Sequence, residues 1–431
     1  MSLWQPELET MPRERIRALQ LERLNRTLAH IWAHAPVQRG LLEAAGYDGS
    51  PLDKLEDIEN LPFTMKKDFH ENYPFGLFAV PREKIVRLHG TSGTTGKPTM
   101  GGYTRADIEL WKDLIARLAC AVGVSAADVA QVSFGYGLFT GGFGLHQGME
   151  HIGAMVLPMS SGNTEKQLMM MEDMGVTVLI ATPSYALYLS EAAAEKGLKD
   201  RLKLRVGLFG GEGCTPEMRQ TIESNLGIIA TNNYGLCELT GPGVSGECAE
   251  RDGLHFAEDH YYAEIIDPDT GKVLPYGEKG ELVITPLSRE ALPLIRYRTR
   301  DITRLNPEPC KCGRTHIRMD PTLGRSDDML IIKGVNVFPS QIESVLIGTE
   351  HIGPHYLLVV RREGRYDTLE VQVELADAAL LENFRKLDNL RETIRENLRS
   401  VLGLSVKVTP VAPQTIERFQ GKAKRVIDLR S

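Results

Sequence analysis

The residues of this chain that are best suited to chemistry form a glycine-rich run from Gly90 to Lys97. The run reads Gly-Thr-Ser-Gly-Thr-Thr-Gly-Lys and combines three glycines, four hydroxyl side chains and one lysine. Glycines allow positive φ angles and expose bare N–H groups, while the hydroxyls add donors and the lysine adds a positive charge. Such a loop suits a polyphosphate. The alternative is a flexible linker, but linkers rarely carry an isolated Lys-Pro end between two patterned elements.

This run differs from the P-loop of many nucleotide-binding proteins. That pattern requires Gly at position 91 and Ser or Thr after the lysine, whereas this chain has Thr91 and Pro98. A proline also argues against a helix that starts directly after the loop. The alternating segment 84–88 predicts a strand that leads into the loop.

A second motif, Asn233-Tyr234-Gly235-Leu236-Cys237-Glu238, follows a predicted strand. The Glu238 carboxylate could hold Mg²⁺, because this ion takes one or two protein carboxylates and keeps water and phosphate as its other ligands. Tyr234 offers a flat face for a base. A turn with a solvated glutamate is an equally good interpretation of this stretch taken alone.

Basic side chains gather near the end of the chain, where the sequence Gly421-Lys422-Ala423-Lys424-Arg425 occurs. Taken alone, this cluster predicts an exposed basic tail, because charge clusters at termini are commonly solvated.

Four candidate metal ligands occur in two pairs, Cys248 with His255 and Cys310 with Cys312. Three thiolates and one imidazole are a sufficient set for tetrahedral zinc, and a site made wholly from protein ligands would be structural. The Cys-x-Cys spacing is unusual, so reduced thiols and a solvated histidine are the alternative. The remaining cysteines are predicted to be non-ligands: Cys120, Cys214 and Cys237.

Alternating strands and helices must position these motifs. Strands are predicted at 176–181, 205–209 and 227–231, and helices at 12–35, after Thr104, after 182–184 and from 215–216. This alternation indicates a mostly parallel sheet covered by helices, whose sites lie at the carboxyl ends of strands. We expect the polar segments 90–97, 210–213 and 232–241 at such ends, and therefore at one site.

The pattern changes after residue 254 to short β-rich runs, and from 328 onward strands and helices alternate on a smaller scale. The order there is strand, helix, strand, strand, helix, strand, as in a ferredoxin-like domain. The predicted fold class is therefore α/β. A large N-terminal domain (1–326) of mostly parallel sheets includes a β-rich subdomain at about 254–326, and a small α+β domain follows (327–431).

Bulk properties restrict the class of function. The chain has 431 residues and a formal net charge of −7, which argues against nucleic acid as a partner. No run is long and apolar enough to predict a membrane span, and the first residues do not resemble a signal peptide. We expect a cytoplasmic protein whose six cysteines are reduced.

The glycine-rich run resembles the phosphate loop of the adenylate-forming (acyl-CoA synthetase) superfamily. The segment Tyr234–Glu238 resembles the superfamily's Tyr-Gly-x-x-Glu motif, and 296–301 resembles its Tyr-Arg-Thr-Gly-Asp segment, although Arg300 replaces the usual glycine. Segments 134–142, 327–343, 353–356 and 421–428 are similar to phenylacetate–CoA ligases. The resemblance covers nearly the whole chain.

The resemblance implies roles for individual residues. Thr95, Glu238 and Lys422 would be catalytic, with Glu238 at Mg²⁺ and Lys422 stabilising charge that builds on the α-phosphate. Asp301 would accept hydrogen bonds from both ribose hydroxyls, and Asp327 would be the hinge. The aryl-acid pocket would include Tyr136, Phe139, Gly211 and Gly235, with ordinary core packing as the alternative for the two aromatic side chains. ATP or AMP would contact Thr91, Ser92, Gly93, Thr94, Thr95, Gly96, Lys97, Gly211, Glu212, Asn233, Tyr234, Gly235, Asp301 and Arg325.

The resemblance implies an AMP-forming ligase that uses ATP and Mg²⁺ to convert phenylacetate, or a related aryl acid, to an acyl-adenylate. The acyl group then passes to coenzyme A after the C-terminal lid rotates. The family also suggests a homodimer. Two alternatives share the nucleotide motifs: an enzyme that loads an aryl acid onto a carrier protein, and a non-catalytic nucleotide-binding sensor.

Overall fold

The computed structural model describes residues 2–91, 97–326, 330–332, 335–347, 349–363, 366–418 and 425–430. Its α-helices are α1 (Pro6–Glu9), α2 (Arg13–His34), α3 (Pro36–Ala44), α4 (Lys66–Glu71), α5 (Arg105–Ala121), α6 (Thr140–Ile152), α7 (Thr164–Asp173), α8 (Pro183–Glu195), α9 (Pro216–Leu226), α10 (Pro339–Ile347) and α11 (Phe384–Leu402). Short 3-10 helices are η1 (Leu55–Asn60), η2 (Arg82–Lys84) and η3 (Ala378–Glu382).

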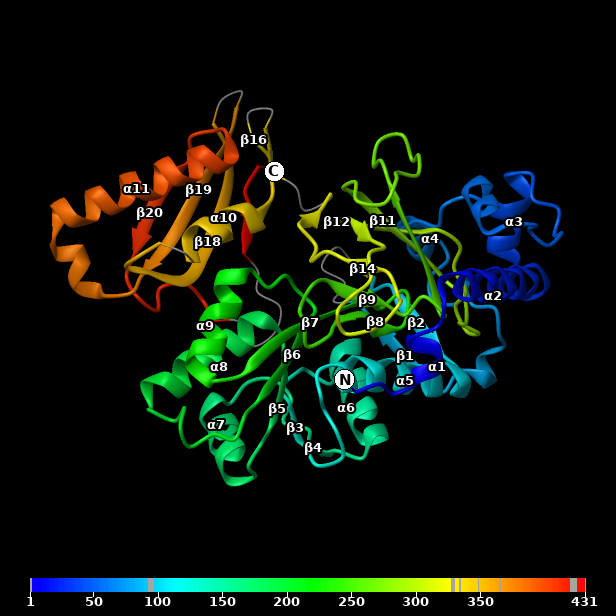
Figure 1. Ribbon diagram of the computed structural model, residues 1–431. Helices are drawn as coiled ribbons and strands as arrows, with labels where there is room; N and C mark the ends of the chain where they lie inside the picture. The colour runs from blue at the N-terminus through cyan, green and yellow to red at the C-terminus, as the bar shows by residue number, and fades with distance from the viewer. Residues whose placement is uncertain are drawn as a thin grey trace. The chain divides into compact units, whose positions relative to one another are not determined.

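The strands are β1 (Arg87–Gly90), β2 (Met100–Tyr103), β3 (Val129–Val132), β4 (Met155–Leu157), β5 (Val178–Ala181), β6 (Val206–Gly210), β7 (Ile229–Leu236), β8 (Gly241–Glu247), β9 (Leu254–Phe256), β10 (Tyr261–Ile266), β11 (Gly280–Pro286), β12 (Tyr297–Thr303), β13 (Leu305–Asn306), β14 (Arg318–Met319), β15 (Gly324–Arg325), β16 (Leu330–Ile332), β17 (Val335–Val337), β18 (Ile352–Glu363), β19 (Tyr366–Leu375), β20 (Lys407–Val411) and β21 (Val426–Asp428). Figure 1 shows these elements in sequence colours. The α/β class predicted from the sequence is confirmed.

Contacts divide the chain into two compact units. The first unit comprises residues 1–181, 200–211 and 228–321, and the second comprises 182–199, 212–227 and 322–431. Within the part of the chain that the structure describes, no helix combines the length and apolar character required to cross a membrane.

A nine-stranded sheet organises the first unit, in the order β13-β14-β9-β8-β7-β6-β5-β3-β4. Its strands are parallel from β4 to β7, and the pairs from β7 to β13 are antiparallel. The expectation of a mostly parallel sheet is therefore corrected to a mixed sheet. Only residues 237–240 join β7 to β8, and parallel neighbours need a much longer crossover connection.

The phosphate-loop segment lies outside this sheet. The strand before it is β1, which begins at Arg87 rather than at residue 84, and it pairs antiparallel with β2 in a separate two-stranded sheet. The expectation that 90–97 follows a strand of the parallel sheet is therefore wrong. Residues 233–236 also differ from expectation, because they lie within β7 rather than beyond its end. Segment 210–213 begins at the last residue of β6, so it does lie at a strand end, as predicted.

Helix α5 packs its apolar face on the large sheet. Trp111 and Ile115 are fully buried in one core cluster with Val132, Ile180 and Leu208 from neighbouring strands. The predicted cap is confirmed, because the Thr104 hydroxyl accepts a hydrogen bond from the Asp107 N–H at 3.1 Å. The Asp107 carboxylate accepts one from the Thr104 N–H at 2.9 Å, which completes a capping box.

A second sheet of the first unit supplies the strand that carries Asp301. In this sheet β10, β11 and β12 pair antiparallel, and β11 is buried along its whole length. The predicted β-rich character after residue 254 is thus found. However, β9, β13 and β14 join the nine-stranded sheet instead of a separate subdomain sheet.

The second unit contains a four-stranded sheet in the order β20-β19-β18-β21, with α10 and α11 packed on it (Figure 1). The predicted order of strands and helices is present. However, the first strand, β16, pairs with β17 in a separate hairpin, and β21 takes an edge of the sheet. The sheet therefore differs from a ferredoxin-like one. The helix expected at 378–400 is divided into η3 and α11, since Asn383 caps α11 through a hydrogen bond to the Lys386 N–H.

Candidate active site and metal centre

The two ends of the glycine-rich loop are held together by Thr91 and Thr99. The Thr91 N–H donates to the Thr99 carbonyl at 3.1 Å, and the Thr99 N–H donates to the Thr91 hydroxyl at 3.0 Å. The Lys97 side chain is exposed, and its Nζ lies 5.0 Å from the centroid of the Tyr73 ring. The predicted phosphate-binding residues Ser92, Gly93, Thr94, Thr95 and Gly96 lie outside the described residues.

The β1–β2 hairpin contacts the turn that carries Glu238. A Cβ on Gly101 would lie 2.7 Å from the Cys237 carbonyl oxygen, so only glycine permits this approach. The Tyr103 hydroxyl donates to the Thr240 carbonyl at 2.8 Å. Strand β2, which follows the glycine-rich loop, therefore contacts the turn formed by residues 237–240, and Glu238 is buried in that turn. Burial also raises the pKa of the neighbouring Cys237 thiol, which keeps it neutral.

Tyr234 and Asp301 form the second part of the site. The Tyr234 hydroxyl donates to Asp301 Oδ2 at 2.6 Å, and the Asp301 N–H donates to the Thr299 hydroxyl at 3.0 Å. Arg300 adopts a φ of 68°, in the left-handed region that favours glycine. The arginine thus adopts a backbone conformation that glycine takes without strain, and the adjacent Asp301 contacts the tyrosine.

Close packing of β6 on β7 sets the positions of Asn233 and Gly211. The Asn233 side-chain amide donates to the Phe209 carbonyl at 2.8 Å. A Cβ on Gly210 would approach the Asn233 carbonyl to 2.6 Å, and Gly211 has a φ of 85°. Gly235 is equally constrained, because a Cβ there would lie 1.7 Å from the Gly241 carbonyl oxygen.

Two predicted nucleotide contacts, Glu212 and Arg325, belong to the second unit. Glu212 accepts a hydrogen bond from the Ser184 N–H at 2.7 Å, at the start of α8. Arg325 lies in β15, next to the predicted hinge. The hinge residue Asp327 and the catalytic candidate Lys422 lie outside the described residues.

The chain after Lys422 is anchored at Arg425. Its guanidinium lies 3.0 Å from the Glu343 carboxylate and 4.5 Å from the centroid of the Tyr356 ring. Burial raises the pKa of Glu343 to about 7, and the Arg425 charge opposes that rise. This pair, between a half-buried arginine and a buried glutamate, holds the residue that follows segment 419–424.

The aromatic pocket candidates Tyr136 and Phe139 have different surroundings. The Tyr136 hydroxyl lies 2.9 Å from His146 Nδ1, and its ring packs edge-on against Phe143 with the centroids 5.2 Å apart. Phe139 precedes α6 and is 41% exposed. Tyr136 also packs against the core of the large sheet, so core packing accounts for part of its surface.

Sequence analysis missed Arg289, which contacts strand β2 of the β1–β2 hairpin although it belongs to none of the predicted motifs. Its Nη2 donates to the Gly102 carbonyl at 2.6 Å, and its guanidinium lies 4.3 Å from the Tyr103 ring centroid. The only signal in the sequence is an arginine within the otherwise largely apolar segment 287–295. Thr99 was also missed, since a single threonine after Lys-Pro predicts no pairing.

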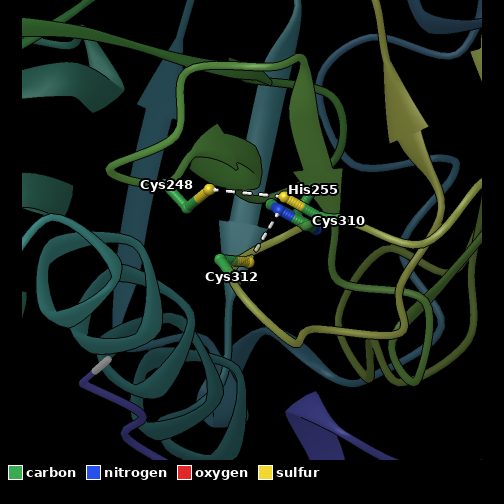
Figure 2. A group of neighbouring side chains, drawn as sticks. All are labelled: Cys248, His255, Cys310 and Cys312. Carbon is green, nitrogen blue, oxygen red and sulfur yellow. Dashed lines mark hydrogen bonds between the residues drawn. The ribbon is translucent and has the colours of Figure 1, made fainter.

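A separate cluster brings together the four predicted metal ligands, Cys248, His255, Cys310 and Cys312 (Figure 2). All four are buried, and their ligand atoms lie within 4.8 Å of one another. The Cys248 and Cys310 sulfurs are 3.8 Å apart, and Cys312 Sγ lies 3.4 Å from His255 Nε2. A zinc tetrahedron with bonds of about 2.0–2.3 Å has edges of roughly 3.3–3.8 Å, so these residues fit that ion.

The thiols of the cluster are not equivalent. The pKa of Cys312 is lowered to about 2, first by the hydrogen bond from the Cys248 thiol and then by the one from His255. The pKa of Cys248 is raised by the same hydrogen bond and by burial. The cluster thus already favours one thiolate, which is the form that binds a metal.

Comparison with known proteins places the chain in a family. A model of the AMP-binding enzymes matches residues 52–286, and a model described as the AMP-binding enzyme C-terminal domain matches residues 334–430. The phenylacetate-coenzyme A ligase of Thermus thermophilus is 46% identical over 99% of this chain and 100% of its own length. That of Escherichia coli is 47% identical over 98% of this chain and 97% of its own length. The chain belongs to the AMP-binding enzymes and, among them, to the phenylacetate–CoA ligase family.

Solved structures agree with this assignment. The crystal structure of 2-hydroxyisobutyryl-CoA ligase in the postadenylation state, bound to an acyl-AMP, is 32% identical and has a TM-score of 0.93, with 99% of this chain and 92% of that chain covered. The same ligase in a thioesterification state with CoA has a TM-score of 0.73 at the same identity and coverage.

Proposed function

We propose that this chain is an AMP-forming ligase that joins phenylacetate, or a closely related aryl acid, to coenzyme A at the expense of ATP. The observation that carries the proposal is the full-length similarity to the phenylacetate-coenzyme A ligases. The meeting of the phosphate hairpin with the Glu238 turn supports it, because adenylation needs the triphosphate and a metal-binding carboxylate in one place.

The reaction has two steps. A carboxylate oxygen of the acid attacks the α-phosphorus of ATP, and the bond to the leaving pyrophosphate breaks. The CoA sulfur, as the thiolate, then attacks the acyl carbon, and the bond to AMP breaks. Both steps put negative charge on oxygen atoms that preorganised donors and cations can stabilise.

We assign the residues of the chain as follows. Thr91 through Lys97 bind the β- and γ-phosphates, and Asp301 binds the ribose while Tyr234 orients its carboxylate. Mg²⁺, when bound at Glu238, supplies charge neutralisation at the phosphates. Tyr136 and Phe139 line one wall of the aryl-acid pocket, and Gly211 and Gly235 leave room opposite. Asn233, Glu212 and Arg325 complete the nucleotide contacts.

The C-terminal lid, residues 327–431, is proposed to turn about Asp327 between the two steps. One site can then serve both half-reactions, because the lid presents a different face in each. The lid brings Lys422 to the α-phosphate during adenylation. The related 2-hydroxyisobutyryl-CoA ligase, which has been solved in postadenylation and thioesterification states, supports this proposal. A cytoplasmic homodimer remains the expected form of the protein.

The proposed function is tested with ATP, Mg²⁺ and CoA against a panel of aryl and alkyl acids, with pyrophosphate, AMP and thioester measured separately. We expect phenylacetate to give the highest kcat/KM, with equal amounts of AMP and CoA thioester. Pyrophosphate exchange without thioester would instead favour a carrier-protein acceptor. Nucleotide binding without exchange for any acid would favour a sensor.

We also propose that the cluster of Cys248, His255, Cys310 and Cys312 holds one structural zinc ion. The ligand chemistry and the short distances within the cluster support this. Elemental analysis of the purified protein is expected to give about one equivalent of zinc, and Cys312→Ser to lose most of it. Cys214→Ser is the matched control and should keep its zinc. Less than a tenth of an equivalent in correctly folded wild-type protein would refute the zinc site.

A further inference from the structure

The residues that follow the last metal ligand hold the beginning of the chain. We call residues 310–316 the cysteine loop and residues 2–11 the N-terminal segment. The cysteine loop lies outside helices and strands, and its turn closes through a hydrogen bond from the Gly313 N–H to the Cys310 carbonyl at 2.9 Å. Regular secondary structure therefore does not determine its position, which depends on what it is bonded to.

Three consecutive residues of the cysteine loop bind the N-terminal segment. Arg314 donates to Glu9 Oε2 and to the Ser2 carbonyl, each at 2.8 Å. The Thr315 N–H donates to the Glu9 carbonyl at 3.1 Å, and its hydroxyl donates to the Met11 carbonyl at 2.7 Å. The next residue, His316, lies with Nε2 3.1 Å from the Leu8 carbonyl.

Glu9 is the centre of this contact. It is 2% exposed, and Arg314 is 4% exposed. The other carboxylate oxygen of Glu9, Oε1, accepts hydrogen bonds from the backbone N–H groups of Trp4 and Gln5 at 2.7 and 2.8 Å. A buried ion pair is stable only while both partners and their hydrogen bonds stay in place, since loss of one partner leaves an uncompensated buried charge. The position of Arg314 therefore bears directly on how firmly the N-terminal segment is held.

A small cavity connects this ion pair to the metal ligands. It has a volume of about 40 Å³, and Glu9, His255, Arg314 and His316 are among its lining residues. Among the described residues, His255 Nδ1 and Arg314 Nη1 are buried without a hydrogen-bond partner. With the metal on Nε2, Nδ1 must carry a proton, so both orphaned groups are donors. One water in this cavity can accept from both, as an outer-shell partner of a metal-bound histidine commonly does.

We propose that the metal of the cysteine cluster and the docking of the N-terminal segment are energetically coupled, through the cysteine loop and the Glu9–Arg314 pair. Metal binding positions Cys310 and Cys312, and hence Arg314 two residues later, so that the segment docks. The segment in turn reaches α5, where the Trp4 indole N–H donates to Asp113 at 2.9 Å and the Gln5 side chain accepts from Arg117 at 2.5 Å. This inference rests on the zinc site proposed above.

Coupling of two binding events is reciprocal, which gives a test that leaves the metal ligands intact. Glu9→Gln removes the charge that docks the segment, and Glu7→Gln removes an exposed carboxylate two residues earlier as the matched control. Zinc affinity is measured by competition with a chromophoric chelator. We expect Glu9→Gln to bind zinc about fivefold or more weakly than wild type, and Glu7→Gln to bind it equally. Equal affinities in all three proteins would overturn the inference and leave the zinc site standing.

Hydrogen exchange provides the second measurement, on wild-type full-length protein with and without zinc. We expect chelation to accelerate exchange at the Trp4, Gln5 and Thr315 amides by about tenfold or more, while β19 stays protected. Unchanged exchange in the N-terminal segment of zinc-depleted protein would overturn the coupling. Wild-type protein that binds no zinc at all would overturn the zinc site and this inference together.

Discussion

Replacement of Lys422 by alanine is expected to slow formation of the acyl-adenylate by about 10²–10³-fold, while transfer of a supplied acyl-adenylate to CoA falls much less. The reason is that adenylation passes through a pentavalent phosphorus with extra negative charge, which a placed ammonium stabilises. Thioester formation builds its charge at the acyl carbonyl, after the lid has turned. Pyrophosphate exchange measures the first half-reaction, and thioester yield from synthetic phenylacetyl-adenylate measures the second.

The control for this experiment is Lys424→Ala, which removes a lysine from the same basic cluster. An exposed basic tail would respond similarly to both substitutions, whereas a catalytic Lys422 separates them. Equal loss in both half-reactions for Lys422→Ala would contradict the role assigned to it. Arg425 is held by its ion pair with Glu343. We therefore expect the substitution of Lys422 to leave the position of Arg425 unchanged.

Replacement of Asp301 by asparagine is expected to lower kcat/KM for ATP by about 10²–10³-fold, because hydrogen bonds to charged groups contribute roughly 1.5–3 kcal/mol each. An amide accepts through one oxygen and carries no charge, so it should bind two ribose hydroxyls more weakly than the carboxylate proposed for this role. The KM for the aryl acid should change little. Steady-state kinetics with ATP and then the acid varied would measure both quantities.

A comparison with 2′-deoxy-ATP sharpens the test of Asp301. Wild-type enzyme should discriminate strongly between the two nucleotides, and Asp301→Asn should discriminate weakly, since the interaction has already been removed. Tyr234→Phe keeps the ring but loses the hydroxyl that bonds Asp301 at 2.6 Å, so we expect an intermediate loss of about tenfold. Undiminished discrimination in Asp301→Asn would show that the ribose binds elsewhere.

Local sequence signals accounted for those parts of the fold that depend on neighbouring residues. Thr104 was predicted as a cap because its hydroxyl meets an N–H three residues later, and the structure has that bond. The strands at β5, β6 and β7 were found because buried parallel strands read as short apolar runs. Arg300, by contrast, looked like a departure from the family pattern, and its φ of 68° shows that it adopts the glycine-like conformation.

Long-range pairing was not predictable from the same signals. Hydrophobic periodicity does not specify the pairing partners of the strands in the antiparallel half of the nine-stranded sheet or in the β1–β2 hairpin. The phosphate loop was therefore expected at the end of a strand in the parallel sheet, whereas it follows β1 of the separate hairpin. The contact of Gly101 with Cys237 shows why the motifs still meet. The contact depends on close backbone approach, which a glycine permits, but a glycine in the sequence does not predict which segment will approach it.

The amino-acid sequence alone identifies the residue types proposed for this protein's chemistry: a phosphate-type loop, a carboxylate after a strand, a terminal lysine and a Cys₃His ligand set. Each is a short pattern whose chemistry depends on the side chains alone. Which of these residues come into contact is visible only in the folded chain. The fold brought Cys248 and His255 to Cys310 and Cys312, and it paired Glu9 with Arg314 across 305 positions of the chain. Such contacts result from the packing of whole elements, because a buried charge is stable only where the fold provides its partner.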